Sequence, residues 1–149
     1  MNIIKFLEHL VGLSRSFGNS LMVSPVIVNV EERSREGWSD PLRGHVSWYT
    51  LFSGDITPTD TMIAGVAELI PGGILNLHRH IQAEIYFVIE GRGTVTVDGK
   101  ESIVVPGSAV FIPSDAEHGI KNDFSEKLRF FYTFSADCFS DVEYKFQSN

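Results

Sequence analysis

The chain has 149 residues, which suits a single domain, and 43% of them are hydrophobic, enough for a packed core without disulfides. The formal net charge is −7, and no cluster of Lys and Arg is present, which argues against a nucleic-acid partner. No stretch approaches the ~20 apolar residues of a membrane-spanning helix, and no signal-peptide pattern is found. We therefore expect a cytoplasmic protein, and the single cysteine, Cys138, fits a reducing compartment.

Residues 1–45 are predicted to form an extension of three parts. Apolar residues with helical spacing predict a short amphipathic helix over residues 2–14, which would cap the rest of the fold or contribute to a dimer contact. Residues 22–30 favour an extended strand, with Pro25 in an edge position, and the polar residues 31–46 favour a loop. The strand could add to a partner's sheet, and we therefore expect a homodimer.

From residue 47 onward, short runs rich in Val, Ile, Phe, Tyr and Thr alternate with Gly, Pro and Asp. Nine strands are predicted, at 47–53, 62–70, 74–80, 83–90, 93–97, 101–105, 109–112, 118–122 and 127–135. Asp98-Gly99 lies between two of these runs and favours a two-residue hairpin. The pattern predicts an all-β sandwich or barrel.

Three of the five histidines form a pattern with one carboxylate. His78 and His80 are two residues apart, so on a strand they point to the same face. Glu84 follows after an even spacing, and His118 lies far along the chain beside a turn. Imidazole and carboxylate together suit one divalent transition metal, with Fe, Mn, Ni, Co, Zn and Cu all left open. Four such ligands leave part of an octahedral sphere free for a substrate.

The spacing of these residues resembles the two motifs of the cupin family. The motifs read Gly72-x5-His78-x-His80-x3-Glu84-x6-Gly91 and Gly107-x5-Pro113-x-Asp115-x2-His118-x3-Asn122. Asp115 replaces the usual glycine of the second motif, and aspartate tolerates the left-handed backbone better than most residues. The resemblance implies a double-stranded β-helix, or jelly-roll barrel, as a cupin domain over residues 46–149. It also implies that His78, His80, Glu84 and His118 hold a metal in the barrel mouth.

Tyrosines next to this pattern are candidate catalytic groups. Tyr86 follows Glu84 by two residues and should face inward, where it could act as a general base or only form the pocket wall. Aromatic residues on other predicted strands and near the C-terminus could line a pocket or belong to the core. They are Trp48, Tyr49, Phe130, Tyr132 and Tyr144.

A closer resemblance is to the small cupin lyases that cleave dimethylsulfoniopropionate into dimethyl sulfide and acrylate. It is carried by AEIYFVIEGRGTVTVDGKE, FIPSDAEHGIKN and FSADCFSDVEYKF. It implies that Tyr86 takes the α-proton and that Tyr144 lies near the substrate, a small carboxylate. Arg79 stands where these lyases carry tyrosine, but strand alternation should point it away from the metal.

Other functions fit the same ligands. An Fe(II) dioxygenase would also use three histidines and a glutamate, and an isomerase could combine a metal with a base. A cupin that binds a ligand without turnover is a third alternative. Fold class alone does not decide among these functions.

Overall fold

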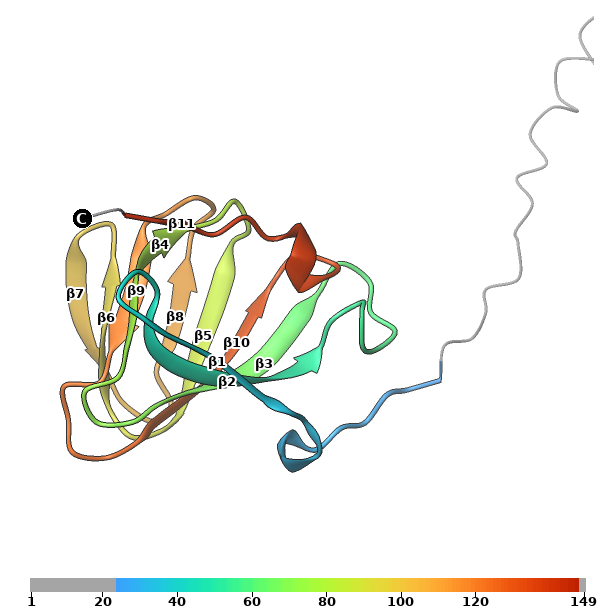
Figure 1. Ribbon diagram of the computed structural model, residues 1–149, viewed down its shortest axis with the longest axis horizontal. Helices are drawn as coiled ribbons and strands as arrows, with labels where there is room; N and C mark the ends of the chain where they lie inside the picture. Colours follow the sequence, from blue (N-terminus) through green and yellow to red (C-terminus); the bar gives the residue numbers. More distant parts are fainter. Residues whose placement is uncertain (1–23, 148–149) are drawn as a thin grey trace, which may run out of the picture.

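The computed structural model describes residues 24–147, and these residues form an all-β fold (Figure 1). The strands are β1 (Arg35–Asp40), β2 (Gly44–Phe52), β3 (Ile63–Leu69), β4 (Ile74–Arg79), β5 (Glu84–Glu90), β6 (Gly93–Val97), β7 (Lys100–Val104), β8 (Ala109–Ile112), β9 (His118–Lys121), β10 (Leu128–Phe134) and β11 (Lys145–Phe146). Two short 3₁₀ helices, η2 (Val30–Glu32) and η3 (Phe139–Asp141), complete the described elements.

The strands form one antiparallel sheet that curls around a central interior. Its order is β7-β6-β9-β4-β2-β3-β10-β5-β8, with β1 paired to β2 and β11 paired to β4. Figure 1 shows β1 and β2 crossing in front, with β8, β5 and β10 forming the wall behind them. The expected all-β barrel is therefore confirmed, and each of the nine predicted runs overlaps a strand.

Alternation along the strands decides which side chains face the interior. On β10 every second side chain is buried, and on β5 the buried residues are Glu84, Tyr86 and Val88. Phe130 and Tyr132 on β10 lie directly opposite Val88 and Tyr86. This period of two brings polar and apolar side chains of both strands into one interior.

Turn residues fix the register of the sheet. The hairpin between β6 and β7 turns at Asp98 (φ 46°) and Gly99 (φ 75°), as expected for an Asp-Gly loop. Gly91 has a φ of 75°, and a Cβ there would lie 2.1 Å from the carbonyl oxygen of Lys127, so no other residue fits. Asp115 adopts a φ of 59°, which agrees with its place at the glycine position of the second motif.

The N-terminal predictions are only partly correct. The loop predicted over residues 31–46 is wrong, because β1 lies within it and pairs with β2. The sequence Asp40-Pro41 is a type I turn signal, and the Asp40 carboxylate accepts hydrogen bonds from two backbone N–H groups of that turn. Residues 24–29 form no strand, contrary to the prediction for 22–30. The helix predicted over 2–14 lies outside the described residues, and the division at residues 45 and 46 stays a prediction.

No helix within residues 24–147 is long and apolar enough to cross a membrane.

Candidate metal centre and its cavity

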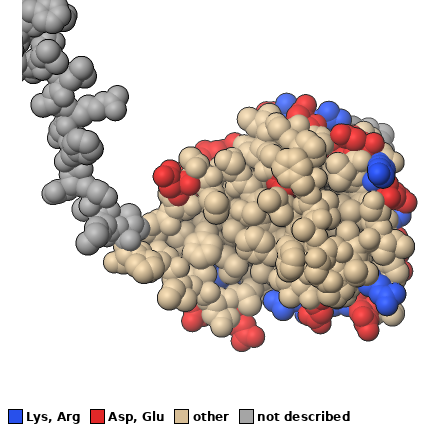
Figure 2. All heavy atoms as spheres, turned by 180° about the vertical axis from the view of Figure 1, so that it is seen from behind, with Lys and Arg blue, Asp and Glu red and all other residues tan. Residues whose placement is uncertain are grey.

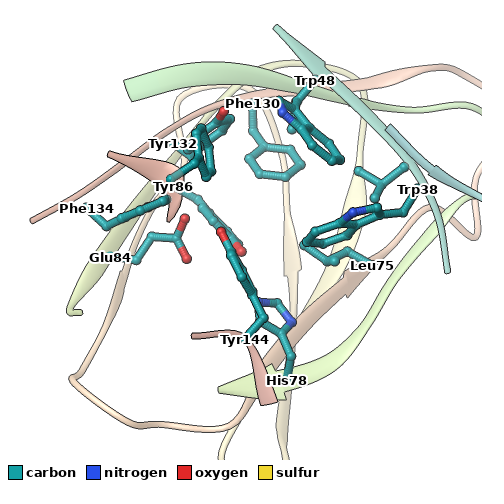
Figure 3. A pocket seen from close by; sticks show the side chains of 13 residues that line it. Trp38, Trp48, Leu75, His78, Glu84, Tyr86, Phe130, Tyr132, Phe134 and Tyr144 are labelled. Atoms are coloured by element: carbon teal, nitrogen blue, oxygen red, sulfur yellow. The ribbon is translucent and has the colours of Figure 1, made fainter. Parts of the chain in front are cut away.

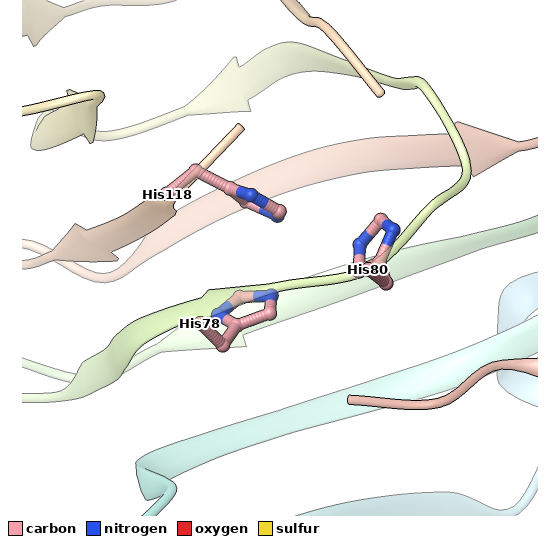
Figure 4. Close-up of side chains that lie close together, drawn as sticks. All are labelled: His78, His80 and His118. Carbon is pink, nitrogen blue, oxygen red and sulfur yellow. The ribbon is translucent and has the colours of Figure 1, made fainter. Parts of the chain in front are cut away.

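Three histidines from different parts of the chain meet inside the barrel. His78 lies on β4 and is the cross-strand partner of His118 at the start of β9, while His80 follows the end of β4. All three are buried, and one ring nitrogen of each lies within 4.8 Å of the others (Figure 4). The period of two along β4 and the pairing of β4 with β9 therefore bring together the three imidazoles that the sequence analysis grouped as candidate ligands.

Backbone carbonyl groups orient each imidazole. The Nδ1 atom of His78 donates to Asn76 at 2.8 Å, that of His80 to Gln82 at 3.0 Å, and that of His118 to Ala116 at 2.9 Å. With Nδ1 carrying the proton, a neutral ring presents its Nε2 lone pair to the interior. Such hydrogen bonds commonly fix the tautomer of metal-binding histidines.

Glu84 completes the cluster from the start of β5. One oxygen of its carboxylate, Oε2, lies 3.3 Å from Nε2 of His80 and 3.2 Å from Nε2 of His118. Burial raises the pKa of this carboxyl, but the neighbouring imidazoles of His118 and His80 lower it more, so the net direction is down. The group therefore faces the imidazoles as an anion.

These donors fit a divalent cation. Neutral imidazole lone pairs and a carboxylate oxygen converge, and Nε2 of His80 has no hydrogen-bond partner within residues 24–147. Donors about 2.1 Å from one ion at right angles would be about 3 Å apart, close to the separations of Glu84 from two of the histidines. Three buried histidines with this carboxylate could therefore hold a borderline transition metal.

Beside the cluster lies a cavity of about 70 Å³ with mostly aromatic walls (Figure 3). It is lined by Trp38, Val46, Trp48, Ala67, Leu75, His78, Glu84, Tyr86, Phe130, Tyr132, Phe134, Phe139 and Tyr144. Of the aromatic residues considered in the sequence, Tyr49 alone does not line this cavity. Two candidate metal donors, His78 and Glu84, thus lie in the same cavity as the aromatic walls.

Both candidate catalytic tyrosines reach this cavity. Tyr86 faces inward from β5, as predicted, and its pKa is raised well above the usual value by burial and by the charge of Glu84. Tyr144 arrives from the C-terminal segment, and its ring centroid lies 5.6 Å from that of His78. Burial, and next the charge of Glu84, also raise its pKa. In the metal-free protein both phenols are protonated at neutral pH.

Sequence reasoning missed Trp38, Phe134 and Phe139 as cavity residues. Phe134 could have been found, because it lies two residues after Tyr132 on the same strand and faces the same way. Trp38 lies on β1, which was taken for a loop, and its ring meets Trp48 and Tyr144 edge to face at 4.9 and 5.4 Å. The position of Trp38 therefore depended on a pairing that the sequence analysis did not predict.

Arg79 and His45 lie away from the cluster. Arg79 points outward and forms ion pairs with Asp115 at 3.9 Å and Glu117 at 3.5 Å, which confirms the prediction from alternation. His45 belongs to neither motif; it is exposed and lies 2.9 Å from the hydroxyl of Ser39.

Acid should destabilise the metal-free protein through His78. Burial and the charge of His118 lower the pKa of His78 to about 3, whereas an unfolded histidine titrates near ~6.5. The unfolded state therefore binds the proton more readily, and stability present above pH ~6.5 is lost as the pH falls toward 3. Urea unfolding of chelator-treated protein should show that the free energy of unfolding falls between pH ~6.5 and pH 3. In the His78→Gln variant the free energy of unfolding should depend less on pH over this range. Equal pH slopes for both proteins would contradict the prediction.

Comparisons with known proteins agree with this geometry. The family model for the cupin domain matches residues 65–134. Over 125 residues the chain is 39% identical to dimethylsulfoniopropionate lyase DddW from Ruegeria pomeroyi, an alignment covering 84% of this chain and 82% of that protein.

Solved structures resemble the fold. A predicted oxalate decarboxylase from Thermotoga maritima superposes with a TM-score of 0.67 and 25% identity, covering 74% of this chain and 98% of that chain. The polyketide cyclase RemF from Streptomyces resistomycificus gives a TM-score of 0.72 at 20% identity, covering 84% of this chain and 87% of that chain. At this identity, the likeness to RemF concerns the fold alone.

Proposed function

Since the chain belongs to the cupin family and is related to a dimethylsulfoniopropionate lyase, we propose that it is a metal-dependent lyase that cleaves a small carboxylate of this type. The observation that carries the proposal is the convergence of three buried imidazoles and one carboxylate beside a cavity that also contains Tyr86. In this proposal His78, His80, Glu84 and His118 are the metal ligands. The donor set leaves the identity of the metal open.

In a β-elimination, the bound cation and Tyr86 would have separate roles. A bound divalent cation would supply Lewis acidity toward the substrate carboxylate and acidify the adjacent C–H. Tyr86, as phenolate, would accept the α-proton, and the C–H electron pair would become the second bond of acrylate. The C–S bond would break at the same time, with its electron pair leaving on dimethyl sulfide. The phenol of Tyr86 would then return its proton to water.

Tyr86 is suited to the role of general base only when a cation is bound nearby. Burial and Glu84 hold its pKa high in the metal-free protein, so the hydroxyl is a weak base there. A nearby divalent charge favours the phenolate and lowers that pKa. Tyr144 lines the same cavity, beside His78, and would position the substrate.

The aromatic wall offers a place for the sulfonium group. Trp38 and Trp48 line the cavity together with Phe130, and an aromatic face attracts a cation. We expect Trp38→Leu to weaken binding of dimethylsulfoniopropionate about 5- to 30-fold, which corresponds to the ~1–2 kcal/mol of such a contact. Binding of 4-methylpentanoate, which has a similar shape and no sulfonium charge, should change much less. Titration calorimetry with both ligands checks this, and an equal loss for both would contradict it.

A headspace assay for dimethyl sulfide tests the function. Metal-reconstituted protein should release dimethyl sulfide and acrylate in equal amounts from dimethylsulfoniopropionate, without consuming oxygen. Chelator-treated protein is the control and should release neither product. Oxygen uptake in place of dimethyl sulfide would favour the dioxygenase alternative, and absence of both would count against the proposed lyase.

A further inference from the structure

The candidate metal donors are buried almost completely. His78 and His118 are each 1% exposed, while His80 is 2% and Glu84 is 5% exposed. A metal ion or a small substrate therefore reaches these side chains only if part of the surrounding wall moves. The parts of a protein that open most readily are those held by few backbone hydrogen bonds.

The C-terminal segment covers one end of the barrel. We call residues 135–147 the strap, and Figure 1 shows it in dark red, running from β10 through η3 to β11 across that end. On its inner side, Tyr144 lines the aromatic cavity, and Phe146 lies against His78 with 5.2 Å between ring centroids. The strap is therefore the part of the wall that closes over the metal donors.

The strap is held much less firmly than the strands. Beyond its root at the end of β10, it is joined to the barrel backbone at only two places within residues 24–147. The carbonyl group of Asp137 accepts a hydrogen bond from Gly54 at 2.7 Å, and β11 pairs with β4 through two residues. By contrast, β10 pairs with β3 along all seven of its residues. Opening at the strap thus breaks fewer backbone contacts than opening between strands.

A second cavity, of about 140 Å³, separates part of the strap from the barrel beside His80. Its lining comes from both sides and is mostly charged: His80, Ile81, Asp115, Asp141, Glu143 and Lys145. Figure 2 shows acidic and basic side chains gathered along this end of the molecule, which is at the top of both views. Exposed ion pairs contribute little to stability, so this part of the contact does little to hold the strap down.

We propose that the strap is a gate that opens to admit metal ions and substrate to the barrel interior, with Phe146 as its latch. Opening separates β11 from β4 and lifts Phe146 off His78, its partner across that strand pair. Closing returns Tyr144 to the cavity and keeps water from the donors. The purpose of the gate rests on the proposed function, but its opening can be measured without metal.

A reversible cross-link tests the gate. Arg79 and Lys145 are directly opposite each other on β4 and β11, and their side chains face outward, away from His78 and Phe146. A disulfide fits such a pair, since opposite Cα atoms in antiparallel strands are about 4.5–5.5 Å apart. The Arg79→Cys/Lys145→Cys protein, made with Cys138→Ser, is therefore closed by oxidation and released by a reductant.

Diethyl pyrocarbonate, which acylates accessible imidazoles, measures opening in the metal-free protein. We expect His78, His80 and His118 to react at least about tenfold more slowly in the oxidised protein than in the reduced one, because the disulfide disfavours the open state. The exposed His45 should react equally in both, and peptide mass spectrometry resolves the sites. Phe146→Ala should speed the reaction of the three buried histidines about three- to tenfold, because an aromatic contact of the closed strap is lost.

Equal rates in the oxidised and reduced proteins would overturn the proposal, as would buried histidines that do not react at all in the reduced protein. Uptake of Mn(II) links the gate to the metal. The EPR signal of free Mn(II) should disappear more slowly when the strap is cross-linked, and equal uptake rates would overturn the strap as the route for metal. A reduced protein whose histidines react but which binds no Mn(II) would contradict the metal site and support the gate.

Discussion

Replacing His118 by alanine should abolish metal binding with little change in the fold. Wild-type protein should retain about one divalent metal per chain, and the variant should bind it at least about a hundredfold more weakly, since even loss of a residue behind a ligand costs 10- to 100-fold. His118 is a donor at the meeting point of β4 and β9, and its Nε2 is one of the two that contact Glu84. Elemental analysis after dialysis measures the metal, and lyase activity should fall in parallel.

The matched control for this change is His45→Ala. His45 is exposed on β2 and lies beside Ser39, outside the cluster, so its loss should leave both metal content and activity unchanged. If His118→Ala and wild type retained equal amounts of metal, His118 would not be a ligand.

Replacing Tyr86 by phenylalanine should remove catalysis while the metal stays bound. The ring of Tyr86 packs against Phe130 with 4.6 Å between ring centroids, and phenylalanine preserves this contact. Only the hydroxyl that would accept the α-proton is lost, so we expect kcat to fall about 10²- to 10⁴-fold, the usual contribution of a general base. The readouts are headspace dimethyl sulfide and metal content of the same sample.

Tyr49→Phe serves as the control for a lost hydroxyl. Tyr49 lies on β2 and does not line the cavity, so its variant should keep the wild-type rate. A Tyr86→Phe protein with an unchanged rate would remove this tyrosine from the mechanism. A variant that lost its metal would assign Tyr86 a role in building the site.

Most of the barrel could be predicted from the sequence because its strands are short, regular and bounded by strong turn signals. Asp98-Gly99 and Gly91 each require a left-handed backbone, which restricts where strands can end. The period of two then predicts that Tyr86 faces inward and Arg79 outward, and the structure confirms both directions. Local rules were sufficient where alternation and turn residues were both clear.

The rest of the cavity depends on strand pairings that no clear alternation in the sequence marks. β1 lacks clear alternation and is held by its hairpin to β2, so Trp38 was not expected in the cavity. Tyr144 was expected near the substrate through a family resemblance alone. Its position follows from the pairing of β11 with β4, in which Phe146 lies opposite His78. Contacts between chain segments more than 60 residues apart therefore had to come from the structure.

The hydrogen bonds from the histidines to backbone carbonyl groups could not be predicted from the sequence either. Asn76, Gln82 and Ala116 contribute only their carbonyl groups, so the identity of their side chains carries no signal. Together they direct three Nε2 lone pairs inward and leave Nδ1 unavailable to a metal. This arrangement would allow the cluster to hold a cation.

Anomalous diffraction from a crystal grown with Mn(II) tests the central claim most directly. We predict one strong peak per chain, about 2.0–2.3 Å from Nε2 of His78, His80 and His118 and from an oxygen of Glu84, with at least one further position open to solvent or substrate. A peak elsewhere, or none among these side chains at a saturating concentration of metal, would contradict the account.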